Sequence, residues 1–208
     1  MVHKALTGIL LAFLISTCQS QDNRSKKPVG GPCEGCEAIH EYGQVNLSPV
    51  DTLPEFQKTE PKLKLTGTVY EKDGVAPASN VILYIYQTNR GGIYPTNGSE
   101  KGWAKRHGYI RGWVKTGRDG RYTFYTFRPG AYPNRRAQEH IHITIKEPAK
   151  NEYYIDEFVF DDDPLLTDRI RNNARNRGGS GISTLVFKEG ILAIERDIVL
   201  GLNIPNYK

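Results

Sequence analysis

The sequence predicts an all-β protein, an antiparallel β-sandwich with an irregular N-terminal arm and one short helix. Two observations carry this prediction. Short runs rich in β-branched and aromatic residues occupy positions 63–70, 81–87, 109–116, 122–128 and 140–146. Turn signals separate them, namely Asp73-Gly74, Asp119-Gly120 and Pro129-Gly130. Short strands punctuated in this way are typical of a sandwich or a barrel.

The first element, residues 1–20, is predicted to be a signal peptide. Lys4 precedes a mostly apolar run at 6–15, which is too short to span a bilayer as a helix. We therefore expect an exported protein, periplasmic or anchored to the envelope. Residues 14–18 resemble a bacterial lipoprotein cleavage site that would place a lipid anchor on Cys18, although Thr17 departs from the usual small residue. Plain cleavage nearby is the alternative.

Residues 21–62 form the predicted arm, which is rich in Gly, Pro and charge and has weak periodicity. It contains Cys33 and Cys36, a spacing compatible with a redox motif, half of a zinc site or a local disulfide. Because the chain has no second Cys-x-x-Cys pair and an oxidising compartment is expected, a short structural disulfide is the default.

The predicted sandwich domain covers residues 63–208. Its one helix is expected at 164–176, since Pro164 suits a first turn and Gly178-Gly179 suits a stop. Two apolar runs, at 184–187 and 191–200, are expected to return the chain to the sheets.

The chain has 208 residues and a net charge of +5, a size that fits one ordinary domain. Its one local basic cluster consists of Arg169, Arg171, Arg175 and Arg177. The cluster follows the acidic run of Asp161, Asp162 and Asp163. We therefore expect a solvated, self-compensating surface and no nucleic-acid partner.

His140 and His142 lie within a predicted strand, one residue apart. Strand side chains alternate between faces, so both imidazoles point the same way and can bind one metal ion. Two tyrosines could complete such a site. Tyr132 stands in a turn shortly before His140, and Tyr94 stands in a long loop between strands. A hard trivalent cation prefers anionic oxygen and holds tyrosine as phenolate. The alternative for each tyrosine is a packed aromatic ring with a satisfied hydroxyl.

The order of these residues resembles that of a known family. Tyr94 comes first, then the Asp119-Gly120 turn, then Tyr132-Pro133, and then His140-Ile141-His142. This arrangement is similar to the intradiol ring-cleavage dioxygenases, the group that contains the catechol and protocatechuate dioxygenases. The resemblance extends from about residue 63 to 166 and includes the Phe158-Val159-Phe160 run.

The resemblance implies a non-haem iron(III) ion held by Tyr94, Tyr132, His140 and His142. It also implies a small aromatic diol and O2 as substrates, with ring cleavage between the two hydroxylated carbons. Tyr132 would leave the metal when the diol binds and accept one of its protons. These residues supply orientation and charge stabilisation.

Two positions depart from the family pattern. Ala137 stands where the family has a catalytic arginine, and Arg136, just upstream, is the candidate to replace it. Glu157 stands where glutamine is usual. A carboxylate near the ring disfavours an anionic substrate such as protocatechuate.

Two other functions compete with the dioxygenase. The segment 66–70 with Asp73-Gly74 and Val81 resembles the opening of transthyretin-like sandwiches, which suggests a non-enzymatic binding module on the envelope. A related fold could also bind zinc or copper without oxygenase activity. Finally, His107 is interpreted either as a residue at the pocket mouth or as a loop histidine without a chemical role.

Overall fold

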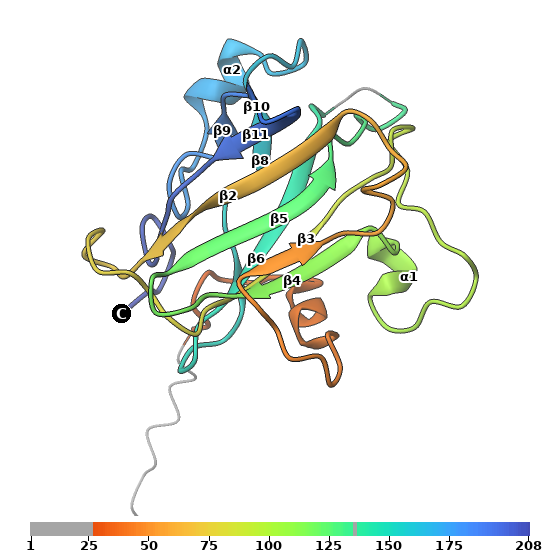
Figure 1. The fold of residues 1–208 in the computed structure, drawn as a ribbon. Helices are drawn as coiled ribbons and strands as arrows, with labels where there is room; N and C mark the ends of the chain where they lie inside the picture. The colour runs from red at the N-terminus through yellow and green to blue at the C-terminus, as the bar shows by residue number, and fades with distance from the viewer. Residues whose placement is uncertain (1–26, 135–136) are drawn as a thin grey trace, which may run out of the picture.

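The computed structural model describes residues 27–134 and 137–208, and its main feature is a pair of stacked β-sheets (Figure 1). The first sheet has the order β1-β5-β2-β11-β10, with β12 pairing to β2. Its strands are β1 (Val50–Thr52), β2 (Lys62–Tyr70), β5 (Arg121–Phe127), β10 (Val186–Lys188), β11 (Ile191–Glu195) and β12 (Ile198–Val199).

The second sheet has the order β4-β3-β6-β8-β9, with β7 pairing to β6. Its strands are β3 (Ile82–Tyr86), β4 (Arg111–Lys115), β6 (His140–Lys146), β7 (Tyr153–Tyr154), β8 (Phe158–Phe160) and β9 (Ile182–Ser183). Three short helices accompany the sheets: η1 (Cys36–His40), α1 (Ala104–His107) and α2 (Asp168–Asn172). Figure 1 shows α1 beside β4 and α2 near β9 and β10.

The period-two alternation of strands decides which side chains enter the core. In β6, Ile141, Ile143 and Ile145 are buried in the main hydrophobic cluster. The alternate positions, which include His140 and His142, therefore point to the outer face of the second sheet. Burying one side chain of this size stabilises the fold by about 1.5–3 kcal/mol, so the register of β6 is strongly specified.

The N-terminal arm covers part of this outer face. Ala38 and Ile39 of η1 are fully buried against Tyr84 of β3. Farther along the arm, β1 pairs with β5 at the edge of the first sheet. The described part of the arm therefore contributes buried side chains and a strand to the sandwich.

The prediction of an all-β sandwich is confirmed, but its purely antiparallel arrangement is wrong. The pairs β1–β5, β11–β2, β12–β2 and β8–β9 are parallel. Hairpin turns force neighbouring strands to run antiparallel, whereas strands joined by long connections are free of that constraint. The strands in the parallel pairs are separated by long stretches of sequence, so turn signals could not reveal their direction.

The predicted helix over 164–176 is shorter in the structure, and it is not the only helix. The helix α2 begins only after Thr167, whose side chain accepts a hydrogen bond from the Ile170 N–H. Pro164 lies in a turn closed by Asp163, whose carboxylate accepts the Leu165 N–H at 2.7 Å. Capping by Thr167 thus starts the helix later than Pro164 suggested. The short helices η1 and α1 were not predicted.

Several predictions concern residues outside the described ranges. The signal peptide at 1–20, the lipid anchor at Cys18 and the role of Arg136 all fall there. Within the described ranges, none of the helices has the length and apolar character needed to cross a membrane.

Candidate metal centre

The two histidines are placed by β6, whose bounds match the predicted strand at 140–146. Their strand lies between β3 and β8, and Tyr86 of β3 is directly opposite His142. His140 is 8% exposed, and His142 is partly buried. A rigid central strand therefore holds both imidazoles on one face.

The two tyrosines come from loops that pack backbone against backbone. A Cβ atom at Gly92 would lie 2.0 Å from the Ala131 carbonyl oxygen, and one at Gly130 would lie 2.3 Å from that of Arg90. Only glycine permits this approach, and Gly92 also has a positive φ of 74°. The Thr88 hydroxyl donates to the Gly130 carbonyl at 2.8 Å, which ties the loops together. The result is that Tyr94 and Tyr132 lie side by side.

All four predicted ligand side chains converge on one point. The Tyr94 hydroxyl lies 2.6 Å from the Tyr132 hydroxyl and 2.7 Å from His142 Nε2. His140 Nε2 lies 3.2 Å from both the Tyr132 hydroxyl and His142 Nε2. Two phenol oxygens and two imidazole nitrogens thus face a common centre.

The outer nitrogen of each imidazole has its own acceptor. His140 Nδ1 donates to the Gln138 carbonyl at 2.7 Å, and His142 Nδ1 lies 2.6 Å from Glu157 Oε1. These partners place the protons on Nδ1 and leave both Nε2 lone pairs facing each other, 3.2 Å apart. Two such lone pairs cannot hydrogen-bond to one another. A cation between them would satisfy both, so the donor set fits a metal ion.

Glu157 supports this arrangement from outside the centre. One ligand atom from each of His140, His142 and Glu157 lies within 4.8 Å of the others, a spacing that a metal ion could also use. However, the carboxylate contacts Nδ1 of His142, whereas the tyrosine oxygens contact Nε2. We therefore assign Glu157 to orienting His142, the usual role of a carboxylate behind a metal-binding histidine.

The ionisation of these groups is consistent with a metal centre. Burial, together with the neighbouring Tyr132 hydroxyl, raises the pKa of Tyr94 far above its ordinary value, and burial also raises the pKa of Tyr132. Neither phenol ionises at neutral pH without a cation. Burial lowers the pKa of His140, so its imidazole is neutral and able to act as a ligand. Burial alone would raise the pKa of Glu157, but the hydrogen bond from His142 outweighs it and holds the pKa at about 2.

His142 is the first of three stacked aromatic rings that the sequence analysis did not predict. The Tyr86 ring lies 4.4 Å from His142, centroid to centroid, and 3.8 Å from His107, with the latter planes 4° apart. The Tyr84 hydroxyl is 2.9 Å from His107 Nδ1. The signal was present in β3, because Tyr84 and Tyr86 alternate on the same face as the histidines. The stack could not be predicted from that alternation alone, because it also requires β3 to pair with β6.

His107 is buried at the end of a helix, so it lies neither at a pocket mouth nor in a loop. It ends α1, is 6% exposed, and packs against the arm, where a Cβ atom at Gly35 would lie 2.9 Å from His107 Nε2. Gly35 has a φ of 88°, which favours glycine. The arm, His107, Tyr86 and His142 thus form one continuous set of contacts.

We expect His107 to make the metal-free protein less stable in acid. Burial, followed by the charge of His142, lowers the pKa of His107 to about 4, whereas an unfolded histidine titrates near 6.5. The neutral form is favoured in the folded state, so stability falls as the pH drops from about 6.5 to 4, by on the order of 3 kcal/mol. Denaturant unfolding of wild type and H107Q at several pH values tests this. An equal pH slope in both proteins over that range would contradict it.

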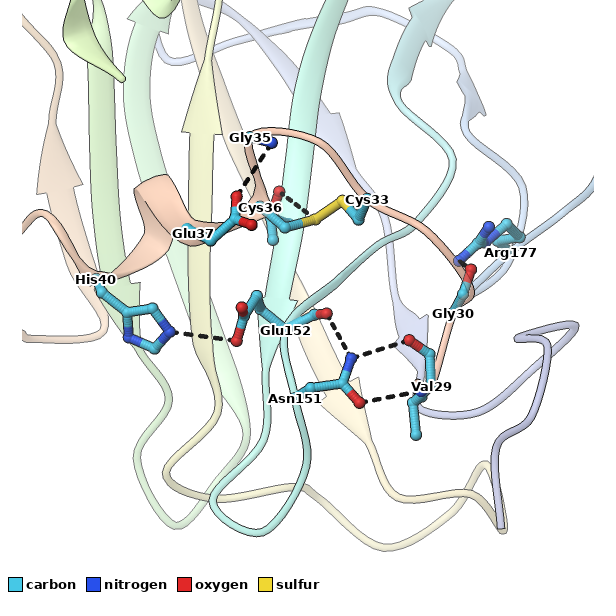
Figure 2. The surroundings of a disulfide bond; sticks show 11 residues. Val29, Gly30, Cys33, Gly35, Cys36, Glu37, His40, Asn151, Glu152 and Arg177 are labelled. Atoms are coloured by element: carbon cyan, nitrogen blue, oxygen red, sulfur yellow. Dashed lines mark hydrogen bonds and ion pairs between the residues drawn. A yellow bond between two sulfur atoms is a disulfide. The ribbon is translucent and has the colours of Figure 1, made fainter. Parts of the chain in front are cut away.

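The predicted disulfide between Cys33 and Cys36 is confirmed (Figure 2). Both cysteines line a pocket that His142 also lines. The Cys36 sulfur is 3.8 Å from the Thr144 hydroxyl of β6. Segment 32–36 forms one wall of a pocket of about 220 Å³ whose other walls include Tyr86, His142 and Glu157. The arm therefore encloses the space next to a candidate ligand.

Several contacts hold the arm in this position. Val29 exchanges two hydrogen bonds of 3.0 Å with the Asn151 side chain, and His40 Nε2 lies 3.2 Å from Glu152 (Figure 2). Glu34 also forms an ion pair with Arg106. Because these contacts surround the disulfide, the cross-link is one of several restraints on the pocket wall.

Removing the disulfide should lower stability by about 2 kcal/mol, the chain-entropy value for so short a loop. The double variant C33S/C36S, compared with wild type by denaturant unfolding, measures this change. Wild type treated with a phosphine reductant is the matched control and should give the same midpoint. A double variant as stable as the oxidised wild type would contradict the expectation.

The arginine cluster is not compensated by the acidic run, which contradicts our prediction. Asp162 pairs with Arg128, Asp161 accepts from the Thr184 hydroxyl, and Asp163 accepts backbone N–H groups. Arg171 donates to a backbone carbonyl, that of Asp161. Among the described residues, Arg169 and Arg175 have no carboxylate partner. Sequence proximity suggested ion pairs, but the turn at 161–163 directs the carboxylates elsewhere.

The chain is similar in sequence to known dioxygenases. A family model described as Dioxygenase matches residues 41–188. The protocatechuate 3,4-dioxygenase beta chain of Burkholderia cepacia is 30% identical over 177 residues, which cover 76% of this chain and 75% of that protein.

Among the solved structures with this fold, two illustrate the likeness. One is the dioxygenase domain of a dioxygenase–carbohydrate-binding protein fusion from Streptomyces sp. SirexAA-E, with a TM-score of 0.56 and 22% identity over 84% of this chain and 98% of that one. The other is catechol 1,2-dioxygenase from Acinetobacter sp. ADP1, with a TM-score of 0.55 and 17% identity over 76% of this chain and 60% of that one.

Proposed function

Because the chain belongs to the intradiol ring-cleavage dioxygenases, we propose that it binds a non-haem iron(III) ion through Tyr94, Tyr132, His140 and His142. We further propose that it cleaves a catechol-type ring between the two hydroxylated carbons. Both atoms of O2 enter the product, which is a muconate-type diacid. The observation that carries this proposal is the convergence of two phenol oxygens and two imidazole nitrogens within 2.6–3.2 Å.

The donor set favours iron(III) over a softer divalent ion. Two phenolates bring anionic oxygen, which suits a hard trivalent cation, whereas zinc sites in proteins use mainly histidine, cysteine and carboxylate. When bound, iron(III) would stabilise the ionised phenols and the ionised diol and make the ring reactive toward O2. The protein's contribution is to hold the donors in a partly buried site.

Tyr132 has the position of the residue that takes a proton from the substrate. It comes from a loop, is partly buried, and its hydroxyl lies between Tyr94 and His140. As a phenolate it accepts the proton of one diol hydroxyl at its oxygen and becomes a neutral phenol. Burial raises the pKa of Tyr132, so its oxygen keeps that proton once it is no longer held by a cation.

Arg136 is our candidate for stabilising negative charge on the ring, in place of the family arginine. Ala137 at the family position has no charge to offer. If Arg136 has this role, R136A should lower kcat for catechol while R136K retains part of it. Equal kcat values for R136A and wild type would rule the role out.

The activity is tested by incubating iron-loaded protein with catechol and 18O2. We expect one O2 consumed per catechol and a ring-opened diacid that carries two 18O atoms. Product cleaved outside the two hydroxylated carbons, or no oxygen uptake, would contradict the proposal. No observation favours the non-enzymatic binding module, and the phenol pair disfavours a zinc site.

We also propose that the protein is exported, with Cys18 as a lipid anchor. The apolar run at 6–15 and the residues that precede Cys18 support this. Expression of the full chain with and without C18A, followed by fractionation, is the test. The wild type should be found with membranes and C18A should not. Cytoplasmic recovery of both would contradict the proposal.

A further inference from the structure

A large groove begins at the two residues that hold the imidazoles in place. Its volume is about 790 Å³, and its lining includes Gln138 and Glu157. The Gln138 carbonyl accepts from His140 Nδ1, and Glu157 contacts His142 Nδ1. Glu157, Tyr154 and Ile155 also border the smaller pocket beside His142. The groove is therefore next to the candidate centre and is far larger than one aromatic ring requires.

The inner surface of the groove is apolar. Val159 and Leu166 are 7% and 5% exposed, Ile182 is partly buried, and Ile170 of α2 is 36% exposed. A hydrocarbon or aromatic group laid along these side chains would bury apolar surface, which is favourable by roughly 25 cal/mol per Å².

The groove is lined by two carboxylates, which have partners, and by two exposed arginines. Asp156 accepts the Asn176 N–H at 2.7 Å, and Glu157 is paired with His142. Arg169 and Arg175 are exposed and, among residues 27–134 and 137–208, lack carboxylate partners. Arg175 donates a hydrogen bond of 3.2 Å to the Tyr154 hydroxyl. A carboxylate in the outer part of the groove would therefore meet two guanidinium groups.

We infer that this groove binds an apolar side chain of the aromatic diol substrate, a side chain that ends in a carboxylate. The inference rests on the proposed function and narrows its substrate class. Glu157 repels a carboxylate attached directly to the ring, whereas Arg169 and Arg175 attract one at the end of an arm of two or more carbons. The preferred substrate is thus a catechol with an acidic side arm, rather than catechol itself or protocatechuate.

The kinetic test compares 3-(3,4-dihydroxyphenyl)propionate with its methyl ester, which has the same ring but no charge. We expect kcat/KM to favour the acid by about three- to ten-fold in wild type, the range for two exposed charge pairs. In R169A/R175A the two substrates should become equivalent. R118A, which removes an exposed arginine from a turn outside the groove, should keep the wild-type ratio.

A second probe does not depend on the metal. The compound 3-phenylpropionate has the acidic arm but no diol, so its binding to metal-free protein, measured by calorimetry, reports on the groove alone. R169A/R175A should weaken this binding by at least three-fold. An acid-to-ester ratio near one in wild type, or unchanged probe binding in the variant, would overturn the inference.

These outcomes separate the groove from the proposed activity. If the protein cleaves catechol but does not prefer 3-(3,4-dihydroxyphenyl)propionate to its ester, only the inference about the substrate side chain is wrong. Failure of every diol to be cleaved, with probe binding still dependent on the arginines, would remove the dioxygenase proposal and leave the groove as an acid-binding site.

Discussion

Replacing Tyr132 with phenylalanine is expected to slow catechol cleavage by a factor of about 10²–10⁴, the usual contribution of a positioned general base. The Tyr132 hydroxyl lies 2.6 Å from Tyr94 and 3.2 Å from His140 Nε2, so its oxygen is close to the place where a diol must bind. Phenylalanine keeps the ring and its packing but removes the oxygen that accepts the proton. Oxygen uptake by iron-loaded Y132F measures the effect.

Two controls separate this role from a loss of structure or metal. Y125F removes a hydroxyl from β5 in the other sheet and should leave kcat unchanged. Iron analysis of Y132F should show that three ligands still retain the metal, with a visible band altered by the loss of one phenolate. Wild-type turnover by Y132F would contradict the assignment of Tyr132 as the base.

Replacing Glu157 with alanine is expected to weaken iron binding by about ten- to hundred-fold, the usual cost of removing a carboxylate behind a histidine ligand. Glu157 Oε1 lies 2.6 Å from His142 Nδ1 and fixes both the tautomer and the orientation of that ring. Competition with a chelator measures the affinity. E195A, which removes an exposed carboxylate from β11 of the other sheet, is the matched control.

The E157Q variant separates orientation from charge. Glutamine can still accept the His142 Nδ1–H, so iron affinity should stay closer to wild type than in E157A. Its neutral amide should raise kcat/KM for protocatechuate relative to catechol, because the repulsion of the ring carboxylate is gone. Iron binding in E157A equal to that of wild type would show that Glu157 does not support the centre.

The candidate centre could be predicted because its signals are local. The alternation of β6 places His140 and His142 on one face, and the order of Tyr94 and Tyr132 before them matches a family pattern. The close contact of the two tyrosine loops at Gly92 and Gly130 joins segments about forty residues apart and was not predicted. Strand alternation was sufficient for the two histidines, whereas the two tyrosines were identified through the resemblance to the family.

The remaining features depend on contacts between distant segments. The stack of His107, Tyr86 and His142 requires the β3–β6 register, the loop that leads into α1 and the arm. The parallel pairing of β11 with β2 joins residues more than a hundred positions apart. We predicted that the acidic run at 161–163 compensates the charges of Arg169 and Arg175, but those carboxylates bind other partners. None of these contacts has a signal within one short segment.

The most direct test of the account is the visible absorption spectrum of the iron-loaded protein, recorded before and after anaerobic addition of catechol. Phenolate oxygens of Tyr94 and Tyr132 on iron(III) should produce a broad visible band, and direct binding of the diol to the iron should shift it. We expect a coloured protein with one iron per chain and a band that shifts when catechol is added. A protein that takes up iron but stays colourless, or a band that catechol does not move, would contradict it.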